Sequence, residues 1–200
     1  MGLDAVVEGY VAAMRPKGEA FAEALKAWCA APAAARDGLV FDVHKFAGSA
    51  GSAGFARLSA VATLIEISLR ALPAGAPDPR DVALIGCLCE DFAEEVAALV
   101  PARSALLTGD ETPVHAPFSA PARVILAGLP TAAAAVLTYL IEQRLGFAFP
   151  LADPAALADV PPGRAPDLAV VGAPVEGVGF PVVVFAPARL SALTAAWPMG

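Results

Sequence analysis

Histidine offers the most distinctive chemistry in this sequence, and the chain contains two of them, His44 and His115. A histidine ring is neutral near pH 7 in its ordinary state, and its free nitrogen can then attack a phosphoryl group. His44 lies in the run DVHKFAGSAGSAGF, residues 42–55. His115 lies in a proline-rich stretch without companion residues, and we expect it to be exposed and inert. With so few histidines, the chain also lacks a nucleophile–base–acid set for a hydrolase.

The spacing of apolar residues around His44 predicts a helix with this side chain on its exposed face. At about 100° per residue, the apolar residues fall within an arc of about 80°, and His44 lies about 140° from its centre. The imidazole should therefore point to solvent. The residues of this apolar seam are Leu39, Val43, Phe46, Ala50 and Ala53.

Two glycines lie on the same face, since Gly48 and Gly51 follow His44 by four and seven residues. Glycine inside a helix costs about 1 kcal/mol relative to alanine, so two of them beside an exposed histidine need a reason. We expect them to clear a shallow trough through which a partner can approach the imidazole. The alternative is an ordinary surface histidine, with glycines that only allow close helix packing.

Polar and aromatic residues complete the candidate site. Lys45 and Ser52 are expected at the edge of the trough, where a cation and a hydroxyl can hold phosphoryl oxygens, and Ser49 is counted among the contact residues. Phe41 and Phe55 are expected at an apolar rim. No metal-ligand set accompanies them.

Residues 1–103 are predicted to form an antiparallel bundle of helices, because apolar residues repeat at three-and-four spacing. Pro16 is expected to end the first helix, and Asp78-Pro79 to begin the last one as cap and first residue. Residues 104–121 are expected to be a proline-rich linker, with no regular element from residue 101 onward. The clearest seams run through Leu58, Ala62, Ile65, Leu69 and Leu72, and through Val82, Ile85, Cys89, Phe92, Val96 and Leu99.

Residues 122–200 follow a different pattern, in which short apolar runs alternate with a helix, as in a small parallel α/β sheet. Strands are expected at 124–126, 147–149, 167–171 and 181–185. Helices are expected at 131–145 and 188–197.

The run HKFAGSAGSAGF, followed by Arg57-Leu58 and Leu64-Ile65-Glu66, resembles the histidine-containing phosphotransfer (HPt) family. The resemblance covers about the first hundred residues and implies that His44 is phosphorylated. It further implies that a receiver domain supplies the phosphoryl group and Mg²⁺, and that His44 passes the group to a second receiver. Many members carry lysine three residues after the histidine, where this chain has Ala47, and Lys45 is a candidate replacement. A scaffold that binds receivers without transfer is the alternative.

The C-terminal part resembles a receiver domain that lacks its phosphorylation site. Ala127 and Gly128 stand where that family has an acidic pair, Gly172 where it has the phosphorylated aspartate, and Ala186 where it has threonine or serine. Such a degenerate receiver should neither bind Mg²⁺ nor accept phosphate.

Composition and motifs limit the classes of molecule that this protein is expected to bind. The net charge is −7 without a basic cluster, which argues against nucleic acid. No nucleotide-binding glycine motif is present, so the expected protein is a phosphocarrier with no cofactor of its own, not a kinase. Partners should be receiver domains and a hybrid histidine kinase, with a homodimer possible. No apolar run approaches the roughly 18 residues of a membrane span, and the start MGLDAVVEGY is not a secretory signal, so we expect a cytoplasmic protein with reduced cysteines.

Overall fold

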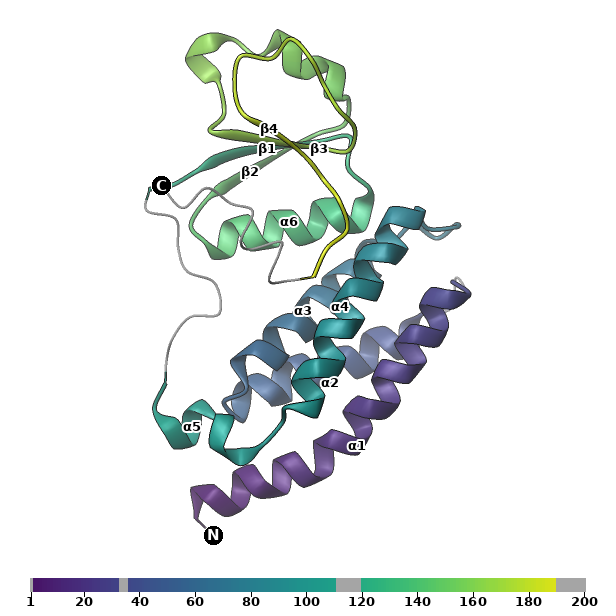
Figure 1. Cartoon of the computed structure of the whole chain (residues 1–200), viewed down its shortest axis with the longest axis vertical. Helices are drawn as coiled ribbons and strands as arrows, with labels where there is room; N and C mark the ends of the chain where they lie inside the picture. The colour runs from purple at the N-terminus through teal and green to yellow at the C-terminus, as the bar shows by residue number, and fades with distance from the viewer. Residues whose placement is uncertain (1, 33–35, 111–119, 190–200) are drawn as a thin grey trace.

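The computed structural model describes residues 2–32, 36–110 and 120–189. His115 and most of the helix expected at 188–197 lie outside these ranges, and the described Ala188 and Arg189 are not helical. Four long helices come first, followed by two short helical turns and a four-stranded sheet (Figure 1).

The N-terminal helices are α1 (Leu3–Ala30), α2 (Asp37–Ser52), α3 (Ala56–Ala71) and α4 (Pro79–Ala97). The expectation that Pro16 ends a helix is wrong, because Pro16 lies inside α1. Proline removes one backbone hydrogen bond and bends a helix, but burial of apolar residues on both sides of it can hold the two halves together. Val7 and Leu25 are both fully buried, and Figure 1 shows α1 as a bent helix.

The expected seams form the core of the bundle. All five seam residues of α3 and its end are buried, and so are all those of α4 and its end except Val82. Phe21, Phe46 and Phe92 meet at its centre, with ring centroids 5.2–5.7 Å apart. The Asp78 side chain accepts a hydrogen bond from the Arg80 backbone N–H and Pro79 opens α4, as predicted.

The stretch expected to lack regular structure begins with two helical turns, so that expectation is wrong for its first residues. These turns are η1 (Pro101–Arg103) and α5 (Ala105–Thr108). The buried Ser104 between them donates a hydrogen bond to the Ala53 carbonyl at 2.7 Å, and the Ala105 N–H donates to the Gly54 carbonyl at 2.8 Å. Contacts with the bundle thus order a segment whose own sequence favours a loop. The domain boundaries at 103 and 121 stay predictions.

The C-terminal part is a parallel α/β sheet, as expected. Its strands are β1 (Arg123–Ala127), β2 (Phe147–Leu151), β3 (Leu168–Val171) and β4 (Val182–Val184), in the order β2-β1-β3-β4. All three pairings are parallel. Helix α6 (Thr131–Gln143) connects β1 to β2, and the short turns η2 (Pro154–Asp159) and η3 (Pro162–Arg164) precede β3.

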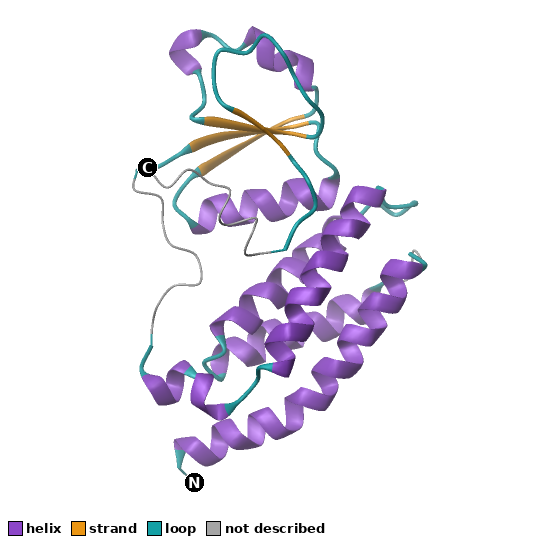
Figure 2. Cartoon of the chain, viewed as in Figure 1, coloured by secondary structure: helices purple, strands orange, loops and turns teal. Residues whose placement is uncertain are grey.

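The sheet has two apolar faces, and one of them joins the core of the bundle. Val124, Leu126, Leu168 and Val170 share a single hydrophobic cluster with α6 and the bundle helices. Ala127, Ala169 and Val171 pack with Leu157 on the other face. Helix α6 therefore lies between the sheet and the bundle (Figure 2).

Candidate functional site

His44 lies on the exposed side of α2, as the helical geometry predicts. Val43, Phe46 and Ala50 bury the opposite side of the helix, and 66% of the His44 side chain is exposed. Its Nδ1 lies 3.1 Å from both carboxylate oxygens of Glu66 on α3. Glu66 is only 15% exposed and also accepts a hydrogen bond from Arg70 Nε at 2.8 Å.

This contact determines which ring nitrogen is free. An ionised carboxylate can only accept hydrogen bonds, so Nδ1 must carry the proton that lies between the ring and Glu66. In the neutral ring, Nε2 then holds the lone pair. Arg70 Nε donates to Oε1 of the same carboxylate, so the group that orients the ring is itself held by a neighbouring side chain.

No role was expected for Glu66 from the sequence, although the residue belongs to the run that resembles the HPt family. A signal was present, because Glu66 is the single acidic residue of α3 and is surrounded by leucine and isoleucine. Glu66 and His44 are 22 residues apart in the sequence, so only the packing of α2 against α3 brings their side chains together.

The two glycines differ in surroundings. An added Cβ at Gly48 would meet nothing within 4 Å, so open space lies one turn beyond His44. At Gly51, a Cβ would lie 3.1 Å from the Ser59 hydroxyl of α3. Gly51 therefore allows α2 and α3 to approach each other, as the packing alternative proposed, whereas the trough expectation fits Gly48.

The remaining polar candidates differ in the groups that they contact. The Lys45 ammonium lies 3.7 Å from the centre of the Phe41 ring, and Ser52 donates to the Gly48 carbonyl at 3.0 Å. The Ser49 hydroxyl lies 3.4 Å from the Tyr10 hydroxyl of α1, away from His44. Burial raises the pKa of Tyr10, and its contact with Ser49 lowers it to a smaller extent.

The two aromatic residues that were expected at the apolar rim, Phe41 and Phe55, differ in exposure. Phe41 is 60% exposed and lies one turn before Lys45, where a docking partner can reach it. Phe55 is 6% exposed and stacks on Tyr10 with ring centroids 5.6 Å apart, so the expectation that it forms part of the rim is wrong. It is the N-cap residue of α3, and the turn between α2 and α3 directs its ring into the core.

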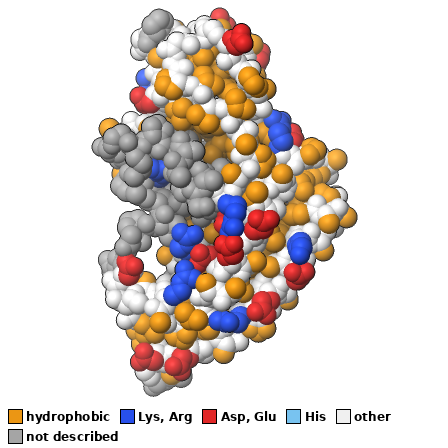
Figure 3. Space-filling model, in the orientation of Figure 1, with side chains coloured by type: hydrophobic (Ala, Val, Ile, Leu, Met, Phe, Trp, Pro, Cys, Tyr) orange, Lys and Arg blue, Asp and Glu red, His pale blue; other side chains and the backbone are white. Residues whose placement is uncertain are grey.

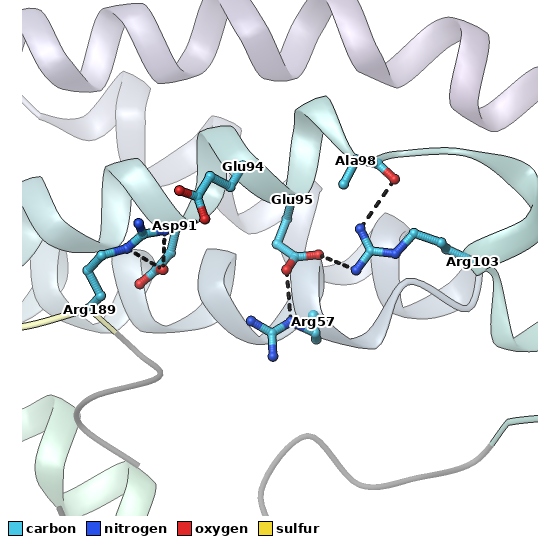
Figure 4. A network of polar contacts seen from close by, with 7 residues as sticks. All are labelled: Arg57, Asp91, Glu94, Glu95, Ala98, Arg103 and Arg189. Carbon is cyan, nitrogen blue, oxygen red and sulfur yellow. Dashed lines mark hydrogen bonds and ion pairs between the residues drawn. The ribbon is translucent and has the colours of Figure 1, made fainter. Parts of the chain in front are cut away.

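A cleft of about 460 Å³ lies at the start of α3, beyond the C-terminal end of α2. Arg57 and Arg103 line it, and both bind Glu95, at 2.8 and 3.3 Å (Figure 4). Because the negative charge of Glu95 lies between the two guanidinium groups, we interpret the cluster as a structural ion-pair network. Positive and negative side chains are also interleaved on the face of the bundle shown in Figure 3.

The chain segments that follow β1 and β3 of the receiver-like sheet approach each other closely. A Cβ at Gly172 would lie 2.0 Å from the Gly128 carbonyl oxygen, so the backbones approach too closely for any side chain there. Arg80 Nη1 donates to the Gly172 carbonyl at 2.9 Å. A guanidinium thus lies close to the position at which a receiver would have its phosphorylated aspartate. Across the described ranges, no group of three or more His, Cys, Asp or Glu side chains is placed to hold a metal ion.

Comparison with known proteins agrees with this arrangement. The model of the Hpt domain family matches residues 5–102. This part of the chain is an Hpt domain, which indicates involvement in a phosphorelay, and Hpt domains are phosphocarriers rather than kinases. Searches among curated proteins and among solved structures found no match.

A further expectation concerns the cysteines. All three cysteines, Cys29, Cys87 and Cys89, are free, as expected. In the part of the chain that the structure describes, no helix is both long and apolar enough to cross a membrane.

Proposed function

We propose that His44 is the phosphoacceptor of a phosphorelay, taking a phosphoryl group from a receiver aspartate and passing it to another receiver. The observation that carries this proposal is the pairing of Nδ1 with Glu66 on an Hpt domain, which leaves the lone pair on Nε2 of a side chain that is 66% exposed.

The transfer forms one bond and breaks one. Nε2 attacks the phosphorus of an aspartyl phosphate in line with the P–O bond, which breaks and leaves the aspartate as a carboxylate. The ring then carries a phosphoryl group on Nε2 and a proton on Nδ1, and its positive charge is balanced by Glu66. The same steps in reverse pass the group to a second receiver, and the partner supplies the Mg²⁺ that both steps require.

Other residues of α2 suit the docked partner. Gly48 leaves room for the approaching active site, and the exposed Phe41 offers apolar contact area. Lys45 lies beside His44 in sequence, and its ammonium can leave the Phe41 ring to bind phosphoryl oxygens. The expected partners are receiver domains and a hybrid histidine kinase, and a homodimer stays a prediction.

The second candidate is a scaffold that binds receivers without transfer. It is favoured by Ala47, which occupies the position at which many relatives carry a lysine.

Phosphoryl transfer from a ³²P-labelled receiver with Mg²⁺ tests the proposal. The wild type should acquire acid-labile label, whereas His44→Gln should acquire none and keep its thermal unfolding midpoint. Glu95→Gln, which changes a carboxylate at the far end of the bundle, should be labelled like the wild type. Receivers that bind the wild type but never label it would support the scaffold instead.

A further inference from the structure

A carboxylate of the bundle stabilises the first turn of α6. Pro130, the N-cap residue of α6, makes no side-chain capping bond. Asp81 of α4 takes this role across the interface, because its carboxylate accepts from the Ala133 N–H at 3.0 Å and from the Thr131 hydroxyl at 3.3 Å. Asp81 is fully buried, and these hydrogen bonds offset the free-energy cost of removing its carboxylate from water. Negative charge at a helix N-terminus is also favoured by the helix dipole.

Two arginines add polar contacts between the bundle and the α/β unit, by which we mean residues 120–189. Arg80 of α4 donates to the Gly172 carbonyl at 2.9 Å. Arg189 reaches back to Asp91 at 2.9 Å and also pairs with Glu94 (Figure 4). The bundle therefore contributes polar groups at both ends of α4, and the α/β unit is attached at both.

Helix α6 covers a flank of α3 that a bare bundle would expose. At about 100° per residue, Leu64, Ile67 and Ala71 lie about 120–180° from the centre of the α3 seam, on the outside of the bundle. Leu64 is nevertheless fully buried, and the other two pack against the hydrophobic core. Since α6 is the element that packs on α3 from outside, these residues lie beneath it.

Glu66 and Arg70 lie on the other flank of the same helix, about 80–120° from the seam centre in the opposite direction. Helix α3 is thus held between α6 on one side and the contact with His44 on the other. A shift or rotation of α3 would move the Glu66 carboxylate relative to Nδ1 of His44.

We propose that the α/β unit is a docked positioning module that fixes α3 through α6, and thereby Glu66 beside His44, with Asp81 as its anchoring residue. Its functional consequence rests on the proposed role of His44, although its structural content does not. The module needs no phosphate site of its own, which agrees with the closed backbone contact at Gly128 and Gly172. It also leaves His44 exposed, so it supports the site without covering it.

The test compares Asp81→Ala with Asp153→Ala in the full chain. Asp153 caps a short turn within the α/β unit by accepting from the Ala155 N–H at 2.9 Å. Asp153→Ala therefore also removes a capping carboxylate, but not one that joins the bundle to the α/β unit. Two quantities are measured without any receiver: amide hydrogen exchange in α6, and the ¹⁵N shifts of the His44 ring, which report which nitrogen carries the proton.

We expect Asp81→Ala to speed exchange in α6 and to move the His44 ring shifts toward a mixture of the two proton positions. Asp153→Ala should change neither. In the transfer assay, Asp81→Ala should lower the maximal rate about three- to fivefold, the effect of losing part of one hydrogen bond, with little change in the concentration of receiver needed for half-maximal rate.

Faster exchange in α6 with unchanged His44 shifts would overturn the proposal, because the module would then be attached without positioning the site. If Asp81→Ala fails to fold, Arg80→Ala gives the same comparison, since Arg80 is partly exposed and its loss removes only the Gly172 contact and its pair with Asp78. A wild type that takes no label from any receiver would refute the function proposed for His44, while the ring shifts would still decide this inference.

Discussion

The contact between Glu66 and His44 leads to a prediction about transfer rate. Glu66→Ala removes the acceptor of the Nδ1–H bond, so the ring is free to rotate and either nitrogen can hold the proton. A hydrogen bond to a charged group contributes about 1.5–3 kcal/mol, but solvent competes for a side chain as exposed as His44, and we take about 1 kcal/mol. Applied to the transition state, this value corresponds to a transfer rate about fivefold lower.

Glu66→Gln separates position from charge. The amide oxygen can still accept from Nδ1, but it does not balance the positive charge of the phosphorylated ring. We expect a loss of about twofold, smaller than that of Glu66→Ala. The assay is single-turnover transfer from a labelled receiver, with the unfolding midpoint measured in parallel.

The matched control is Glu95→Ala on α4. Glu95 is 14% exposed, against 15% for Glu66, and it also binds arginine, but its partners are Arg57 and Arg103 (Figure 4). Its transfer rate should equal that of the wild type. If Glu66→Ala transfers as fast as Glu95→Ala, the carboxylate does not prepare the imidazole and the reasoning is refuted.

Three further predictions concern glycine and cysteine. Gly48→Ala should stabilise the fold by about 0.5–1 kcal/mol in chemical denaturation, because alanine has the higher helix propensity and the new Cβ meets nothing within 4 Å. The transfer rate should fall at the same time, because the methyl group narrows the trough. An unchanged transfer rate would show that the trough has no part in the mechanism. Gly54→Ala should lower the unfolding midpoint by about 4–8 °C, because Gly54 has φ +79° and a Cβ would lie 2.7 Å from the Leu106 nitrogen; a midpoint equal to that of the wild type would contradict this strain. Burial, with a smaller effect from Cys89, raises the pKa of Cys29 from 9.0 to about 11. Alkylation of Cys29, followed by mass spectrometry, should therefore be about tenfold slower near pH 7.5 than that of an ordinary thiol and still be rising at pH 10; a plateau by pH 9 would be inconsistent with it.

Periodic patterns were sufficient for the elements and for the exposure of His44. The seams of α3 and α4 and the four strands lie close to their predicted positions, because each depends on spacing within one segment. The same holds for the cap at Asp78 and Pro79, which involves neighbouring residues only.

Errors occurred where a distant segment overrides local preference. Pro16 fails to end α1 because the residues on both sides of it share one core, and residues 101–108 form helical turns because Ser104 and Ala105 bond to the end of α2. Phe55 is buried because the turn before α3 directs it inward, which no helical pattern predicts.

By itself, the sequence determined the bundle, the parallel sheet and the face on which His44 lies, since these follow from local periodicity and residue type. Only the tertiary structure placed Glu66 beside His44, Asp81 at the start of α6 and α6 over the outer flank of α3. Each of these pairs is separated by 22 to 52 residues or joins whole elements, and their contacts depend on how helices pack against one another, which residue spacing within a helix does not specify.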